Sequence, residues 1–182
     1  MADFSNKQLT NKGKHLAFLL RHDKEAFDAG LIDIHGWRQV SELIKSQGYS
    51  KELLDEIVST NEKQRYEYSS DKSKIRARQG HSIPVDVELT QMTPPDILYH
   101  GTQADVFYSH IQQEGLKPMQ RQYVHLSADT ETATKVGSRR RGELFIIKIN
   151  AKRMSEDGIK FWRSNNGVWL TLSVLPSYFI YE

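Results

Sequence analysis

The stretch Arg65-Tyr-Glu-Tyr-Ser-Ser-Asp-Lys-Ser-Lys-Ile-Arg-Ala77 carries the pattern of a β-hairpin. Two short runs, residues 65–68 and 74–77, flank the polar turn Ser69-Ser-Asp-Lys72. Runs of this kind on either side of a polar turn indicate two paired strands. In the second strand, side chains alternate between faces, so Arg76 and Arg78 are expected on the same face.

Three helical patterns precede this hairpin. Ser5 and Gln8 have capping-box spacing at the start of an apolar stripe that runs to Arg21 and His22. A second stripe is expected to begin near Arg38 and to end before residue 48, and Ser50 can cap a third stripe over residues 53–58. Three helices followed by a hairpin is the order of a winged helix, so we expect a winged-helix-like lobe over residues 1–92.

The segment Thr93-Pro-Pro95 is the best candidate for a linker, because two prolines favour an extended chain and interrupt helices and sheets. Beyond it, short β-rich runs dominate, at residues 97–99, 123–126, 144–149, 168–172 and 178–181. Helical segments are expected around residues 106–114 and 130–136. The sequence therefore predicts an α+β protein whose helical N-terminal lobe is followed by a β-rich lobe over residues 96–182.

Composition narrows the function classes. Hydrophobic residues make up 38% of the 182 residues, enough for a packed core, and the absence of cysteine excludes disulfides and thiolate chemistry. With no apolar run of membrane-spanning length and no signal peptide, an intracellular, cytoplasmic protein is expected.

The net charge is only +2, yet residues 63–81 carry six basic against two acidic side chains, and residues 117–153 carry nine against three. Two such stretches suit local polyanion sites, although solvated surface explains them equally well.

Four groups of residues are candidates for chemistry. Arg21 and His22 could bind phosphate, or they could simply stabilise the end of a helix. The run Ile75-Arg-Ala-Arg-Gln-Gly-His-Ser82 is dense in donors for an anion, and its glycine allows close backbone approach. A glycine in Tyr99-His-Gly-Thr102 could let a ligand pack on the backbone, while lone histidines such as His100 and His125 are more often structural. No spacing typical of a zinc site occurs.

Together these segments resemble the RNA 2′-phosphotransferase family, the NAD-dependent enzymes first understood in tRNA splicing. The matching pieces, in family order, are LLRH, HGW, KQRYEYSS, IRARQGHS, PPDILYHGT, YVHLSAD, VGSR and NGVWLT. They extend over almost the whole chain. The resemblance implies a C-terminal lobe of the ADP-ribosyltransferase type, with NAD⁺ as co-substrate, no metal, and an RNA bearing an internal 2′-phosphate as partner. We expect a monomer that does not associate with membranes.

The resemblance also assigns roles to residues. The essential arginine and histidine set falls on Arg21, His22, Arg76 and Arg139. The residues expected to bind NAD⁺ are His100, Gly101, Thr102, His125, Leu126 and Ser127. Those expected to bind the RNA are Arg78, Gln79, His81, Ser82 and Arg140. Guanidinium groups aimed at the reacting phosphate would stabilise the charge that builds there, and they stay charged at any working pH.

The chain departs from the family motifs at several positions, and one of these departures leaves an alternative open. Three arginines, 139–141, precede Gly142 where the family commonly has one arginine and a histidine, so either Arg139 or Arg140 could take the fourth essential position. His35 precedes Gly-Trp where aspartate is frequent.

Two other functions compete with the phosphotransferase: ADP-ribosylation of terminal phosphates on nucleic acid, and nucleic-acid binding without catalysis. The strand that carries a catalytic glutamate in many protein-modifying ADP-ribosyltransferases has none here, which argues against protein modification.

Overall fold

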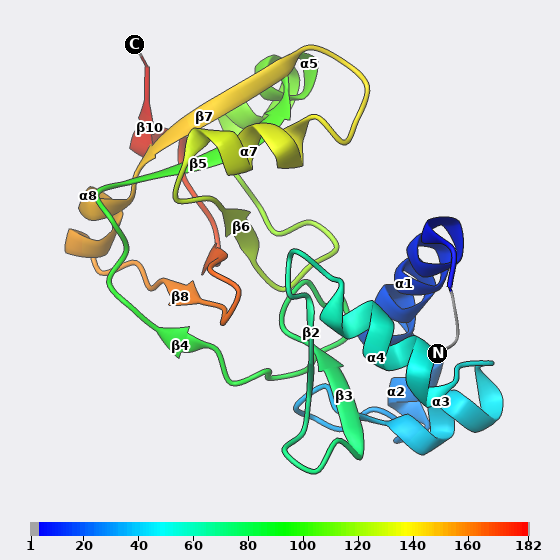
Figure 1. Ribbon diagram of the computed structural model, residues 1–182. Coiled ribbons are helices and arrows are strands. Elements are labelled where there is room, and N and C mark those ends of the chain that lie inside the picture. The colour runs from blue at the N-terminus through cyan, green and yellow to red at the C-terminus, as the bar shows by residue number, and fades with distance from the viewer. Residues whose placement is uncertain (1–3, 182) are drawn as a thin grey trace. The chain divides into compact units, whose positions relative to one another are not determined.

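The computed structural model describes residues 4–181 and divides the chain into two compact units, Met1–Glu88 and Leu89–Glu182. Figure 1 labels their elements. The strand β4 (Thr90–Gln91) pairs with β8 (Trp162–Arg163). It therefore belongs to the second unit, although it precedes the proline pair at which the sequence places the linker. Each unit has its own core and is described by itself.

Helices make up most of the first unit. They are α1 (Asn6–Arg21), α2 (Lys24–Asp28), α3 (Val40–Ser46) and α4 (Lys51–Ser59). The capping box predicted for α1 is present, since Ser5 Oγ accepts from the Gln8 backbone and the Gln8 side chain accepts from the Ser5 backbone. Ser50 caps α4 as expected. The second predicted helix corresponds to α3, which begins at Val40, two residues after Arg38, because residues 38–39 form a strand. The short helix α2 was not predicted.

The predicted hairpin is confirmed. Strands β2 (Tyr66–Tyr68) and β3 (Lys74–Ala77) pair antiparallel, and β1 (Arg38–Gln39) adds to the other edge of β3. Ile75 and Ala77 are fully buried in the core of this unit. The intervening Arg76 therefore projects from the opposite face of β3. That core is formed chiefly by the apolar stripes of α1, α3 and α4 and by these two strand residues.

The second unit contains two antiparallel sheets. One has the order β10-β7-β5 and the other the order β4-β8-β9-β6. Their strands are β5 (Ile97–Gln103), β6 (Val124–Leu126), β7 (Leu144–Asn150), β8 (Trp162–Arg163), β9 (Trp169–Thr171) and β10 (Phe179–Ile180), in addition to β4. Reciprocal backbone hydrogen bonds between Tyr99 and Ser127 connect β5 of the first sheet to the end of β6 in the second.

Helices connect and cover these strands. They are α5 (Ala104–Val106), the π-helix η1 (Phe107–Ile111), α6 (Gln112–Glu114), α7 (Thr130–Gly137), α8 (Ala151–Glu156) and the 3₁₀-helix η2 (Pro176–Tyr178). The first three run on from one another, which matches the helix expected around residues 106–114. Helix α7 packs across β5 and β7 (Figure 1).

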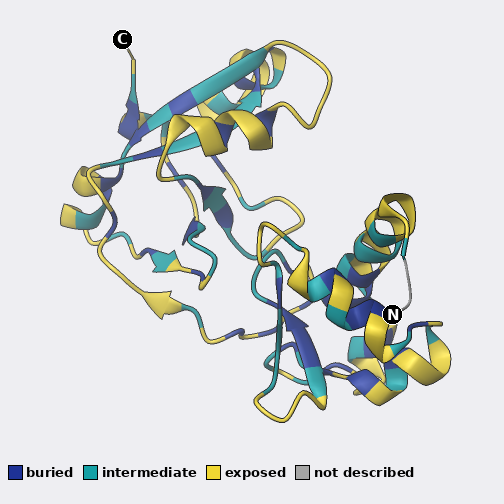
Figure 2. Cartoon of the chain, in the orientation of Figure 1, coloured by how far each residue is buried: buried dark blue, intermediate teal, exposed yellow. Residues whose placement is uncertain are grey.

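The core of the second unit lies where the two sheets meet. Leu98 and Ile149 from one sheet, with Leu126 and Trp169 from the other, are among its buried residues. Figure 2 shows β5, β6 and β7 as largely buried or half-buried, whereas β4 and the outer side of α7 are exposed. The α+β class predicted from the sequence is confirmed. Within residues 4–181, none of the helices has both the length and the apolar character needed to cross a bilayer.

Candidate active site

In the first unit, the end of α1 is joined to a segment sixty residues further along. The backbone N–H of Ser82 donates to the carbonyl of Arg21 at 2.9 Å, and His22 Nδ1 lies 2.9 Å from Ser82 Oγ. The sequence left open whether Arg21 and His22 merely cap a helix. The structure shows that they end the helix and also meet Ser82, so two of the predicted site segments come together here.

Gly80 lies beside the Arg21 guanidinium, and its backbone conformation is one that favours glycine. Its φ is +89°, a conformation that residues with a side chain rarely adopt, and a Cβ at this position would lie 3.7 Å from the Arg21 guanidinium. The neighbouring His81 is only 2% exposed, and a Cβ on Gly36 would lie 3.5 Å from its Nε2. In this structure His81 therefore packs inside the unit, next to the turn that contains Gly36. The side-chain oxygen of Gln79 is also buried.

Arg76 and Arg78 share one carboxylate, as their expected common face predicts. Arg76 Nε donates to Glu67 Oε1 at 2.7 Å, and Arg78 Nη1 lies 3.6 Å from Glu67 Oε2. The Arg76 guanidinium also stacks over the ring of Trp37, with Cζ 4.3 Å from its centre. Glu67 and Trp37 are neighbours of the site that the sequence did not reveal, because both contacts depend on the fold and not on spacing along the chain.

In the second unit, the two segments predicted to bind NAD⁺ lie side by side. His100 Nδ1 is 3.0 Å from the carbonyl of His125, next to the backbone bridge between Tyr99 and Ser127. Burial lowers the pKa of His100, although the hydrogen bond to this carbonyl opposes the shift. Because a carbonyl only accepts, Nδ1 carries the proton in the neutral ring and Nε2 is left as a hydrogen-bond acceptor.

The remaining residues of these two segments differ in what they can offer a ligand. Leu126 is 2% exposed and belongs to the core, so only its backbone is available to a ligand. His100, Thr102, His125 and Ser127 are each half-buried. Their side chains can supply hydroxyl and imidazole groups, which suit the hydroxyl-rich riboses of a dinucleotide.

Packing against α7 gives a reason for glycine at position 101 that the sequence did not reveal. A Cβ there would lie 2.1 Å from the carbonyl oxygen of Ala133 in α7, a distance that no side chain tolerates. Gly137 of the same helix also packs against Gly101, because a Cβ on Gly137 would lie 3.1 Å from the Gly101 Cα. The space above Gly101 is therefore filled by α7. Gly101 therefore has a packing role against α7, and its expected role in binding NAD⁺ stays a prediction.

The chain that leaves α7 carries the arginine run. Arg139 and Arg140 both lie in the turn after Gly137, and both are exposed. Burial, and next the like charges of Arg139 and Arg140, lower the pKa of Arg121. Three guanidinium groups thus gather in one region of the second unit, which suits a phosphate or pyrophosphate. Arg121 was not among the site residues predicted from the sequence. The one sequence feature that could have indicated it is its position within the basic stretch 117–153.

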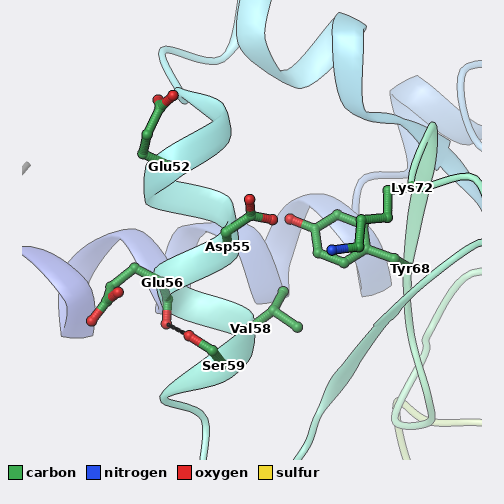
Figure 3. Close-up of a pocket in the computed structure, with 7 residues that line it drawn as sticks. All are labelled: Glu52, Asp55, Glu56, Val58, Ser59, Tyr68 and Lys72. Carbon is green, nitrogen blue, oxygen red and sulfur yellow. Dashed lines mark hydrogen bonds between the residues drawn. The ribbon is translucent and has the colours of Figure 1, made fainter. Parts of the chain in front are cut away.

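A cavity of about 360 Å³ in the first unit has a different character. Its lining comprises Glu52, Asp55, Glu56, Val58, Ser59, Tyr68 and Lys72. Figure 3 shows the carboxylate of Asp55 directed at the hydroxyl of Tyr68, beside the two other acidic side chains of α4. Burial and this carboxylate raise the pKa of Tyr68 above its ordinary value. An acidic lining repels phosphate, so this cavity is not a candidate for the RNA site.

Comparison with known proteins identifies the family of this chain. The family model of the RNA 2′-phosphotransferases, the Tpt1 / KptA family, matches residues 7–173. The chain therefore belongs to this family.

Relatives include proteins named "Probable RNA 2′-phosphotransferase" from three bacteria. The one from Acaryochloris marina is 46% identical over 180 residues, 96% of this chain and 98% of the relative. The one from Hahella chejuensis is 49% identical over 178 residues, covering 95% and 94%. The one from Escherichia coli strain HS is 43% identical over 184 residues, covering 98% of both.

Proposed function

We propose that this chain removes an internal 2′-phosphate from RNA by transferring it to NAD⁺. The products would be 2′-hydroxyl RNA, nicotinamide and ADP-ribose 1″,2″-cyclic phosphate, formed by way of a 2′-phospho-ADP-ribosylated RNA. NAD⁺ would supply an electrophilic ribose carbon and a leaving group. The observation that carries the proposal is family membership over nearly the full chain, combined with arginine and histidine groups at the positions the family motifs mark.

The first unit would act as the winged-helix-like lobe that binds the RNA phosphate. Arg21, His22 and Arg76 would contact the 2′-phosphate, and Arg78 and Ser82 would contact the RNA. His81, which is buried, and Gln79, whose side-chain oxygen is buried, would instead hold this segment in shape from inside the unit. The contact between His22 and Ser82 Oγ holds the imidazole in place for this role. Fixed cations at the phosphate stabilise the negative charge that develops during transfer without reorganisation at that moment.

The second unit would act as the NAD⁺-binding lobe of ADP-ribosyltransferase type. The acceptor Nε2 of a neutral His100 suits a ribose hydroxyl, and Ser127 and Thr102 offer further hydroxyl groups. Arg139 would complete the essential set, and the arginines around it would attract the pyrophosphate of the dinucleotide and the RNA backbone. No metal is needed in this scheme, because arginines provide the positive charge.

The proposal is tested by incubating the protein with an oligonucleotide that bears one internal 2′-phosphate, with and without NAD⁺. We expect the 2′-phosphate to disappear only when NAD⁺ is present. Phosphate loss without NAD⁺ would instead define a phosphatase and contradict the proposal. A parallel incubation with a 5′-phosphorylated oligonucleotide separates the alternative, since a stable mass increase of one ADP-ribose would identify ADP-ribosylation of terminal phosphates. Size-exclusion chromatography of the same sample checks the expected monomer.

A further inference from the structure

Arg76 is tied into the first unit before any substrate arrives. Its side chain is 10% exposed, its Nε donates to Glu67, and its Nη1 donates to the backbone carbonyl of His35 at 3.2 Å. With Trp37 beneath it, the guanidinium is fixed on several sides. Within residues 4–181, the hydrogen bonds that Arg76 donates come from Nε and Nη1, and none comes from Nη2.

A second carboxylate, that of Glu88, also pairs with this guanidinium. Glu88 Oε2 lies 3.2 Å from Arg76 Nη1. The two carboxylates differ in exposure, because the side chain of Glu67 is 18% exposed and that of Glu88 is 59% exposed. The carboxylate partner Glu67 is therefore mostly buried, whereas most of the Glu88 side chain is in contact with solvent.

The backbone at Glu88 has an unusual conformation. Its φ is +57°, a left-handed value that costs energy in a residue with a side chain. The Glu88 N–H donates to Asp86 Oδ1 at 2.9 Å, and the Asp86 N–H donates to the Ile34 carbonyl at 2.7 Å. His35 Nδ1 lies 2.9 Å from the Asp86 carbonyl. The segment that carries Glu88 is thus fastened to the turn whose carbonyl also holds Arg76.

We propose that Glu88 is a positioning residue that occupies the phosphate's place on Arg76 until the substrate arrives. In the free protein its carboxylate neutralises and orients the buried guanidinium. The 2′-phosphate of the RNA then displaces it and takes over Nη1, with Nη2 donating a second bond. This inference rests on the proposed function, which assigns the 2′-phosphate to Arg76.

The balance of interactions favours this exchange. An ion pair with one largely exposed partner contributes little, because water screens the charge and competes for the hydrogen bond. A phosphate monoester carries close to two negative charges and three terminal oxygens, and arginine binds such groups with paired hydrogen bonds. Glu67 remains in place during the exchange, so the buried guanidinium stays oriented while its outer partner changes.

The test compares the variant Glu88→Gln with the control variant Glu56→Gln. Glu56 is an exposed residue of α4, and its replacement changes the net charge by the same amount. Binding is measured by fluorescence anisotropy without NAD⁺, so that no turnover occurs. Two oligonucleotides are used that differ only in one internal 2′-phosphate. A second variant, Glu88→Ala, removes the hydrogen-bonding side chain altogether, and thermal melting establishes that each variant is folded.

We expect both Glu88 variants to bind the 2′-phosphorylated oligonucleotide about two- to fivefold more tightly than Glu56→Gln does, the range that loss of an exposed competing ion pair implies. Affinity for the 2′-hydroxyl oligonucleotide should match that of the control. Equal affinities of the Glu88 and Glu56 variants for the 2′-phosphorylated strand would overturn the inference, as would an equal gain for both strands. Failure of the wild-type protein to prefer the 2′-phosphorylated strand would count against the proposed function itself.

Discussion

Arg139 and Arg140 are adjacent residues in the turn after α7, and both lie close enough to lower the pKa of Arg121. Adjacent side chains in a turn point in different directions, so they cannot contribute equally to one phosphate. We predict that Arg139→Ala lowers the single-turnover rate of 2′-phosphate loss by roughly 10²- to 10³-fold, the typical cost of one electrostatic donor at a reacting centre. Arg140→Ala should chiefly weaken RNA binding.

The matched control for this pair is Arg141→Ala, an exposed arginine of the same turn. It should retain the wild-type rate at saturating substrate. If Arg140→Ala rather than Arg139→Ala abolishes turnover, the assignment of the fourth essential position moves by one residue. Rates measured at saturating RNA and NAD⁺ separate loss of chemistry from loss of binding.

Protonation of His100, in the segment expected to bind NAD⁺, makes the free energy of unfolding depend on pH. Its pKa is lowered in the folded protein, chiefly by burial, so the unfolded chain binds a proton more readily than the folded one. The stability is at its full value above the unfolded pKa of about 6.5, and it is lost as the pH falls from there through the lower folded pKa. We predict that the free energy of unfolding decreases from pH 7.5 to pH 5.5 and that His100→Gln reduces this decrease.

Urea unfolding at several pH values measures the effect. His110→Gln is the control, because His110 has a largely exposed side chain on η1. An unchanged pH dependence in His100→Gln would show that the imidazole titrates alike in the folded and unfolded states. The neutral form matters for function as well, since only that form leaves Nε2 as an acceptor.

At the scale of elements, the contact between β5 and α7 depends on a missing side chain. We predict that Gly101→Ala destabilises the protein by at least about 2 kcal/mol, because its Cβ would overlap the Ala133 carbonyl oxygen and force the helix from the sheet. Gly13→Ala in α1 is the matched control, since the nearest atom to its Cβ would be 3.9 Å away. Alanine favours helix over glycine, so this control should be neutral or stabilising. Equal unfolding free energies for the two variants would contradict the packing described here.

Elements with a local signal were predictable from the sequence. The capping box at Ser5, the cap at Ser50 and the hairpin around Ser69–Lys72 all follow from neighbouring residues, and all are present. The two-residue strands β4 and β8 could not be foreseen, because so short a segment shows no periodicity. The reason for Gly101 was equally hidden, since it depends on a helix thirty residues away.

At the scale of the whole molecule, the essential set predicted from the family motifs is divided between the two units. Arg21, His22 and Arg76 belong to the first, and Arg139 lies in the second together with the residues expected to bind NAD⁺. Motifs identify such residues because their types and order are visible in the sequence. The partners that orient them, Glu67 and Glu88 among them, were missed because ion pairs between distant positions leave no local pattern.

The central claim is that the RNA's phosphate is transferred to NAD⁺ and not released by water. The most direct measurement is mass spectrometry of the products formed from an oligonucleotide whose 2′-phosphate carries ¹⁸O in its terminal oxygens. We predict ADP-ribose cyclic phosphate that contains labelled oxygen, together with 2′-hydroxyl RNA and nicotinamide. Labelled inorganic phosphate with intact NAD⁺ would contradict the claim.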